Sequence, residues 1–235
     1  MRLTPKTIYK KLSKELGKQN WWPMDNEYHK NNHTDPRFEV IVGAILTQNT
    51  AWSNVEKAID TLKKYRILDI DNISNKNLNK IKVMIKSAGF FNQKAERLKN
   101  FAVYLKDNYN GSLDLFFSRG IIDIRNELLS LNGVGPETAD SILLYAGNKP
   151  IFVVDAYTKR LCQRLPLNTD VDYENIQNYF QNELSKSYSK DELLGTYNEL
   201  HALIVIFAKT YCKKKPLCKD CPLEKNCKYP GKNLS

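Results

Sequence analysis

Four cysteines lie close together near the C-terminus at a spacing suited to metal ligation. They are Cys212, Cys218, Cys221 and Cys227, in the pattern C-x5-C-x2-C-x5-C. Four thiolates in one loop (212–227) can ligate a [4Fe-4S] cluster or a zinc ion. Zinc ribbons use two C-x2-C pairs, whereas this loop has one, so the spacing favours the iron–sulfur cluster. The fifth cysteine, Cys162, stands apart and is expected to be a small buried apolar residue.

A second candidate site is a glycine-containing turn between two helical segments. Residues 128–140 read LLSLNGVGPETAD, which predicts a helix, a short hairpin and a new helix that begins at Pro136. Gly133 and Gly135 allow a sharp turn and leave backbone N–H groups unobstructed by side chains. Such donors at a helix N-terminus can hold a phosphate group, although an ordinary helix–helix turn can have the same glycine spacing.

An acid follows the turn at the start of a basic helix. The segment 151–160 reads IFVVDAYTKR, and it places Asp155 at the position of a helix N-cap. A capping carboxylate contributes about 1 kcal/mol to stability. It is also rigid and partly desolvated, so it can stabilise positive charge on a substrate. The capping role and the chemical role are therefore compatible.

The composition suits a polyanionic partner. Lys and Arg number 36 against 26 Asp and Glu, for a net charge of +10. Charge alone does not separate DNA from RNA or from a membrane surface. The N-terminus has no apolar signal core, and the longest apolar stretch, at 40–46, is too short to span a bilayer. We therefore expect a soluble, cytoplasmic protein.

The hairpin, the acid and the spacing between them resemble the helix-hairpin-helix DNA glycosylases of the endonuclease III superfamily. The resemblance implies that Asp155 is catalytic, activating water or stabilising an oxocarbenium-like sugar. It also implies that Gly133 and Gly135 bind DNA phosphate. The cysteine pattern is similar to this family's C-x6-C-x2-C-x5-C cluster loop, with the first gap one residue shorter. Lysines interleaved with the cysteines indicate either further phosphate contacts or a solvated charged surface.

One position departs from the bifunctional members of that superfamily. In those proteins, a lysine two residues after the second hairpin glycine forms a Schiff base with the sugar, and here that position is Glu137. A carboxylate cannot form an imine, so we expect a monofunctional glycosylase without lyase activity. The resemblance places Glu137 among the substrate-binding residues, although the helix dipole also favours an acid in the first turn of any helix.

Two further segments resemble the parts of these enzymes that hold the duplex open around a flipped nucleotide. The segment GAILTQNT (43–50) places Gln48 where the family's glutamine enters the vacated space. The segment GFFNQKA (89–95) places Phe90 where an apolar residue intercalates. Taken singly, Phe90 could equally be a core residue.

Three tryptophans and a proline indicate which class of damaged base the protein would bind. Trp21, Trp22, Pro23 and Trp52, with the motifs above, resemble the bacterial 3-methyladenine DNA glycosylase branch over about residues 20–165. The resemblance implies that these four residues line the base pocket, where indole faces attract a cationic base by about 2 kcal/mol. They could instead only pack the two lobes together. The best-known member of that branch lacks the cysteine cluster, which leaves another damaged base open as the substrate.

Apolar residues recur at helical spacing along almost the whole chain, and no segment sustains the alternation of a strand, so we predict an all-α protein. Asp35 and Pro36 predict the start of a buried helix. We expect a two-lobed helix-hairpin-helix glycosylase fold with a C-terminal [4Fe-4S] cluster loop. A six-helix lobe at 37–149 holds the hairpin, and the second lobe combines 1–36 with 150–235.

The predicted function is base excision repair. A cytoplasmic, nucleoid-associated monomer with a [4Fe-4S] cluster and no membrane contact would remove alkylated purines, such as 3-methyladenine, from double-stranded DNA. Two alternatives are open. A mismatch (thymine or uracil) or oxidised-base glycosylase would use the same scaffold. A non-catalytic DNA-binding protein would use the hairpin and the basic surface without turnover.

Overall fold

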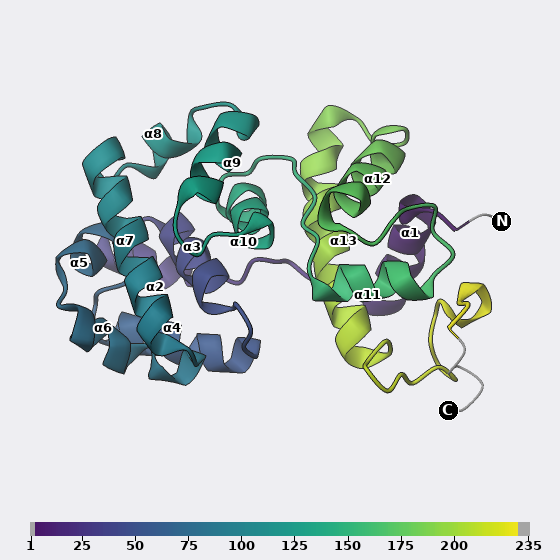
Figure 1. Ribbon diagram of the computed structural model, residues 1–235, viewed down its shortest axis with the longest axis horizontal. Helices are drawn as coiled ribbons and strands as arrows, with labels where there is room; N and C mark the ends of the chain where they lie inside the picture. The colour runs from purple at the N-terminus through teal and green to yellow at the C-terminus, as the bar shows by residue number, and fades with distance from the viewer. Residues whose placement is uncertain (1–2, 230–235) are drawn as a thin grey trace. The chain divides into compact units, whose positions relative to one another are not determined.

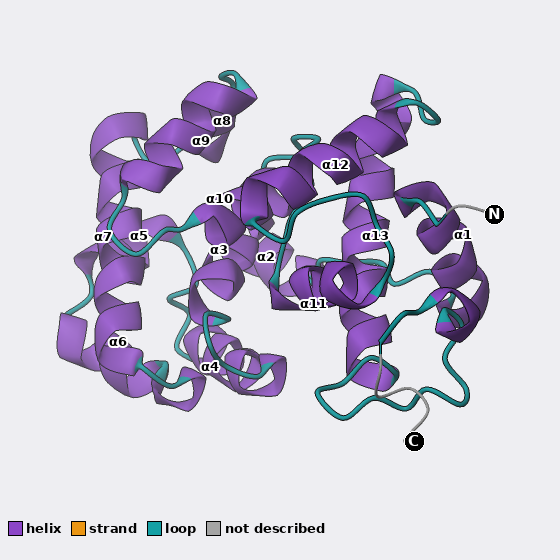
Figure 2. Ribbon diagram, turned by 45° about the vertical axis from the view of Figure 1, so that its right-hand side comes forward, coloured by secondary structure: helices purple, strands orange, loops and turns teal. Residues whose placement is uncertain are grey.

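The computed structural model describes residues 3–229, and within that range its regular elements are helices, with no strand (Figure 1, Figure 2). This confirms the predicted all-α fold class. Over the same residues, no helix combines the length and the apolar character needed to cross a membrane.

The chain forms two compact units, which are described separately below. The hairpin unit is Trp22–Asn148, and the second unit combines Met1–Trp21 with Lys149–Ser235. Our expected boundary at residue 37 differs from this division, because residues 22–36 cluster with the hairpin unit.

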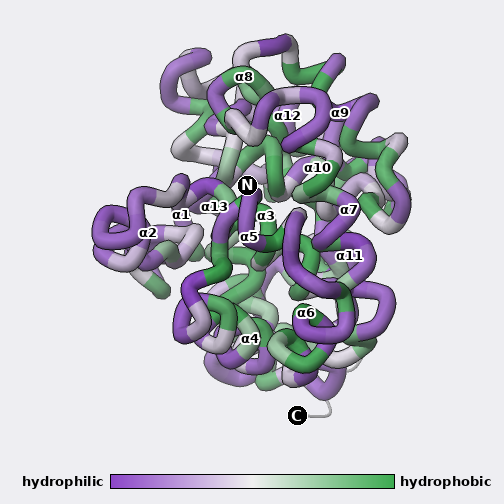
Figure 3. Tube along the Cα trace, turned by 90° about the vertical axis from the view of Figure 1, so that its left-hand side faces the viewer, coloured by the Kyte–Doolittle hydropathy of each residue, from purple (hydrophilic) through white to green (hydrophobic). Residues whose placement is uncertain are grey.

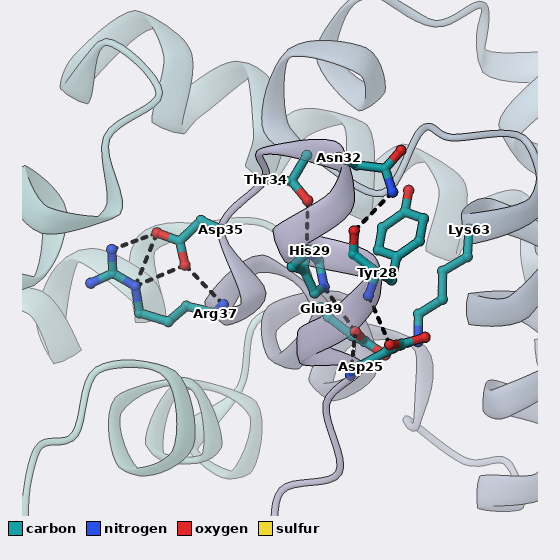
Figure 4. Close-up of polar contacts among 9 residues, drawn as sticks. All are labelled: Asp25, Tyr28, His29, Asn32, Thr34, Asp35, Arg37, Glu39 and Lys63. Carbon is teal, nitrogen blue, oxygen red and sulfur yellow. Dashed lines mark hydrogen bonds and ion pairs between the residues drawn. The ribbon is translucent and has the colours of Figure 1, made fainter.

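A buried polar network attaches the segment before residue 37 to the hairpin unit (Figure 4). His29 lies on α2 (Asn26–Asn32) and is 2 % exposed, and its Nε2 lies 2.8 Å from Glu39 Oε2. Lys63 Nζ makes a second contact with Glu39, at 2.7 Å. Burial alone would raise the pKa of the Glu39 carboxyl, but His29 and Lys63 hold that pKa below its ordinary value. Without α2, the buried Glu39 carboxylate would lose its His29 partner and keep Lys63. This buried contact ties residues 22–36 to the hairpin unit.

The hairpin unit, every residue of which the structure describes, contains nine α-helices instead of the predicted six. In chain order they are α2, α3 (Pro36–Leu46), α4 (Trp52–Lys64), α5 (Ile70–Asn75), α6 (Leu78–Met84), α7 (Phe91–Tyr109), α8 (Leu113–Phe117), α9 (Ile121–Ser130) and α10 (Pro136–Ser141), with the short 3-10 turn η1 (Lys86–Ala88) and the π turn η2 (Ile142–Ala146). The central helix is α3, which begins at Pro36 after the Asp35 cap, as predicted. Its residues from Phe38 to Leu46 are all buried, and it packs against α4, α7 and η2. A helix that is buried along most of its length is enclosed by its neighbours, and its one buried acid, Glu39, is paired with His29 and Lys63.

The second unit is built around its longest helix, α13. Its elements are α1 (Pro5–Leu16), α11 (Ala156–Arg164), α12 (Tyr173–Ser185), α13 (Lys190–Thr210) and the 3-10 turn η3 (Glu224–Asn226). Ser189 and Glu192 form a capping box at the start of α13, and the helix packs against α1, α11 and α12. Phe152 stacks on Phe180 with ring centroids 4.6 Å apart, which anchors the apolar segment leading to α11. Hydrophobic and hydrophilic stretches alternate along the helices, as amphipathic packing requires (Figure 3).

Candidate active site

The predicted glycine turn is a helix-hairpin-helix formed by α9 and α10. Gly133 has φ +82°, a left-handed conformation that L side chains rarely adopt, so this position favours glycine. Gly135 is extended, with φ −94°, and a Cβ at this residue would meet no protein atom within 4 Å. The backbone at Gly135 therefore faces open space that a ligand can approach.

Gln48 contacts this hairpin directly. Its side-chain amide donates hydrogen bonds of 2.9 Å to Gly133 O and to Thr138 Oγ1, and Arg97 donates a hydrogen bond to its Oε1. The adjacent cavity, of about 270 Å³, is lined by four predicted site residues: Gln48, Gly133, Gly135 and Glu137. The fold thus brings these four residues together, with the Glu137 side chain exposed in the first turn of α10.

Phe90 immediately precedes α7, and its side chain is 66 % exposed, so it does not belong to the core. Next to it is Lys94, which our sequence analysis did not single out. Lys94 is 1 % exposed and donates hydrogen bonds to Leu46 O at 2.8 Å and Ala88 O at 2.7 Å. Burial lowers the pKa of Lys94 to about 8. This lysine ties the segment that precedes Gln48 to the segment that precedes Phe90.

An aromatic cluster lies elsewhere in the hairpin unit. The Trp22 ring centroid lies 5.2 Å from that of Trp52 and 5.1 Å from that of Tyr145. The indole of Trp22 also rests against Gly43, where an added Cβ would approach it to 3.0 Å. Tyr145 was not predicted, and it lies on the π turn η2. Turns of this type are frequent at functional sites.

Trp21 and Pro23 are not part of this aromatic cluster. Trp21 belongs to the second unit, where its ring lies edge-on to His201 with centroids 6.0 Å apart. Pro23 is exposed. Within the hairpin unit, the structure therefore assembles two of the three predicted tryptophans.

Asp155 is the N-cap of α11, as its position in the sequence predicts. Its Oδ1 accepts hydrogen bonds from Thr158 N at 2.7 Å and from Thr158 Oγ1 at 2.9 Å. Its Oδ2 lies 3.7 Å from Nε2 of His201, a residue of α13 to which we had assigned no role. Burial by itself would raise the pKa of Asp155, but His201 and the Thr158 hydrogen bonds hold that pKa below its ordinary value. A rigid, buried and ionised carboxylate can stabilise a developing cation or accept a proton from water.

The four loop cysteines converge on one apolar cavity of the second unit. Its lining includes Leu161, Phe207, Leu223 and the four cysteines, Cys212, Cys218, Cys221 and Cys227. Arg164, at the end of α11, holds this loop by donating hydrogen bonds to Cys212 Sγ at 3.2 Å and to Lys213 O at 2.8 Å. Cys162 is buried on α11 and is not among the residues that line the cavity.

The donor set of this loop is four cysteine thiols that line one apolar cavity, and four thiolates are a ligand set that fits a [4Fe-4S] cluster. Among the described residues, no three His, Cys, Asp or Glu side chains are gathered closely enough to hold a metal ion.

These features define a class of protein: all-helical DNA repair proteins in which a helix-hairpin-helix is followed by a helix-capping aspartate. The chain belongs to the HhH-GPD superfamily of base excision DNA repair proteins, whose family model matches residues 42–186. It is a base excision repair DNA glycosylase of that family, which confirms the predicted membership of the endonuclease III superfamily.

Individual relatives agree with this assignment. A Methanocaldococcus jannaschii protein, provisionally described as a DNA repair glycosylase, is 46% identical over 94% of both chains. Endonuclease III of Sulfolobus acidocaldarius is 30% identical over 84% of both chains. Among solved structures, a 3-methyladenine DNA glycosylase of H. pylori, bound to 1,N6-ethenoadenine, is similar with a TM-score of 0.71 at 27% identity. That match covers 88% of this chain and 98% of the other.

Proposed function

We propose that this protein is a monofunctional glycosylase that hydrolyses the N-glycosidic bond of N-alkylated purines, such as 3-methyladenine, in double-stranded DNA. The observation that carries the proposal is the aromatic cluster of Trp22, Trp52 and Tyr145. An N-alkylated purine is cationic, and a desolvated cation–π contact contributes about 2 kcal/mol, or roughly a 30-fold preference over the neutral base. The similarity to the H. pylori 3-methyladenine glycosylase supports the same substrate class.

Asp155 would support cleavage of the bond. Positive charge develops on the sugar as the base leaves, and the ionised carboxylate would stabilise that charge or accept a proton from the attacking water. A cationic base leaves readily, so the reaction needs neither a strong general acid nor a lysine nucleophile. Glu137 stands where bifunctional members have the lysine, and it cannot form an imine. Both arguments favour hydrolysis without strand cleavage.

The hairpin unit would hold the DNA and the flipped nucleotide. The open backbone at Gly135 gives a phosphate access to the turn, and the net charge of +10 favours a polyanion. The exposed ring of Phe90 is available to insert between bases, and Gln48 is held beside the hairpin by its own hydrogen bonds. A glycosylase needs such groups to stabilise a duplex from which one nucleotide has been removed.

The cysteine loop would hold a [4Fe-4S] cluster with a structural role. When bound, the cluster would cross-link the loop to the end of α13, and Arg164 already joins that loop to α11. Hydrolysis of a glycosidic bond requires no electron transfer, so a structural role is sufficient. Six exposed lysines on this loop would add contacts with DNA phosphates: Lys213, Lys214, Lys215, Lys219, Lys225 and Lys228.

Chromatography of the bases released from methylated duplex DNA tests the substrate and the monofunctional character together. We expect free 3-methyladenine and an intact abasic strand, with no covalent protein–DNA complex after borohydride is added. Duplexes containing uracil, a thymine mismatch or an oxidised base, assayed in parallel, test the alternatives. Release of these bases without release of alkylpurine would overturn the substrate proposal. Borohydride trapping at a rate comparable to base release would overturn the monofunctional one.

Gly135→Ala tests whether the hairpin grips phosphate. Because alanine tolerates φ −94° and its Cβ meets no protein atom, we expect stability to be unchanged or raised by about 0.4–1 kcal/mol. The added methyl group would block the approach of a phosphate, so affinity for duplex DNA should fall by about 10-fold. Thermal unfolding and fluorescence anisotropy with a labelled duplex measure the two effects.

Gly195→Ala is the matched control for that variant. Gly195 lies within α13, and a Cβ added there also meets no atom within 4 Å. This control should raise stability by about 1 kcal/mol and leave DNA affinity unchanged. Equal DNA affinity in the two variants would show that Gly135 does not contact phosphate.

A further inference from the structure

We propose that His201 is a positioning residue for Asp155, which orients the carboxylate from a second helix. The inference rests on the catalytic role proposed above for Asp155. His201 comes from α13, whereas Asp155 and Thr158 belong to the start of α11. The two carboxylate oxygens are therefore held from two different helices.

Each oxygen of Asp155 has its own partner. Thr158 donates two hydrogen bonds to Oδ1, at 2.7 and 2.9 Å, and His201 Nε2 lies 3.7 Å from Oδ2. One anchor alone would let the carboxylate rotate about its Cβ–Cγ bond. Polar contacts to both oxygens, from two helices, restrict that rotation, and a preorganised electrostatic catalyst needs such restriction.

The imidazole of His201 is itself held in place. His201 is 5 % exposed, and its ring packs edge-on against Trp21, with an interplanar angle of 72°. Trp21 is one of the aromatic residues that we expect to contact the flipped base. His201 thus contacts Trp21 on one side and the proposed catalytic carboxylate on the other.

Charge gives His201 a second effect. Burial disfavours the ionised form of Asp155, and two neighbours oppose this effect: His201 from α13 and the uncharged Thr158 from α11. Without the imidazole, the buried carboxylate would retain its protonated form to higher pH. The protonated form can neither stabilise a cation nor accept a proton.

The test is the pH dependence of single-turnover base release by His201→Leu and His201→Gln. Leucine removes the polar group that lies 3.7 Å from Oδ2, so we expect the rate at neutral pH to fall by about 10- to 100-fold, and the acid limb to move to higher pH. Glutamine keeps a donor near Oδ2 and should recover part of the rate. The affinity for damaged duplex should stay unchanged in both variants, because His201 acts through Asp155.

His29→Gln is the matched control, because it also removes a buried histidine that is paired with a carboxylate, Glu39, but in the other unit. It should lower thermal stability without moving the acid limb. Unchanged pH profiles in both His201 variants, with Asp155→Asn inactive, would overturn the positioning role and leave the proposed function intact. Full activity of Asp155→Asn would instead overturn the catalytic assignment and this inference with it.

Discussion

Replacing Asp155 with asparagine should lower the rate of base release by about 10²- to 10⁴-fold at neutral pH. The change removes the negative charge and leaves the shape of the side chain almost unaltered. Asparagine is as good an N-cap as aspartate, so α11 and the overall stability should be preserved. Three measurements on the same preparation are needed: single-turnover base release, thermal unfolding and DNA affinity. Together they distinguish a loss of catalytic rate from a loss of folding or of DNA binding.

Asp172→Asn is the appropriate comparison for this variant. Asp172 caps α12 in the same unit by accepting a hydrogen bond of 2.9 Å from Asn175 N, but it is exposed and is not paired with a histidine. It should retain the full rate of base release. If Asp155→Asn released bases as fast as Asp172→Asn, the catalytic assignment of Asp155 would fail. If neither variant nor the wild type released any base, the non-catalytic DNA-binding alternative would gain support.

Cys218→Ala should abolish the proposed iron–sulfur cluster and cause the largest loss of stability among the variants described. The variant removes one of four thiolates from the shared cavity, and three ligands hold a cluster poorly. Loss of a structural metal centre costs more than about 4 kcal/mol, which corresponds to a fall in Tm of roughly 10 °C for a chain of this size. Iron content, the visible absorbance of the cluster and thermal unfolding measure these effects.

Cys162→Ala provides the internal comparison, because Cys162 is a buried cysteine outside the cavity. It should keep its iron and its absorbance, with a loss of stability near 1 kcal/mol. Stoichiometric zinc without iron in the wild-type protein would contradict the cluster proposal. Equal iron content in the Cys162 and Cys218 variants would contradict the assignment of Cys218 as a ligand.

The sequence by itself determined the helical class and the contiguous motifs on which the proposed chemistry depends. Helical periodicity, the Asp35 cap with Pro36, and the N-cap position of Asp155 are local features, and the structure contains all of them. The hairpin and the cysteine loop are also contiguous motifs, so their residues could be identified before any packing was known. Local hydrogen bonding and backbone sterics act between residues a few positions apart, so such features can be predicted from the sequence alone.

Only the tertiary structure decided which distant residues meet. It paired His201 with Asp155, placed Tyr145 against Trp22, and buried Lys94 between two segments of the hairpin unit. It also attached α2 to the hairpin unit, where we had expected a boundary at residue 37. None of these contacts follows from spacing, because a polar or aromatic residue has the same local propensity whether it faces solvent or a buried partner. The close packing of whole helices selects which residues become partners. Within that packing, a buried polar group is stable only beside a group that forms a hydrogen bond with it.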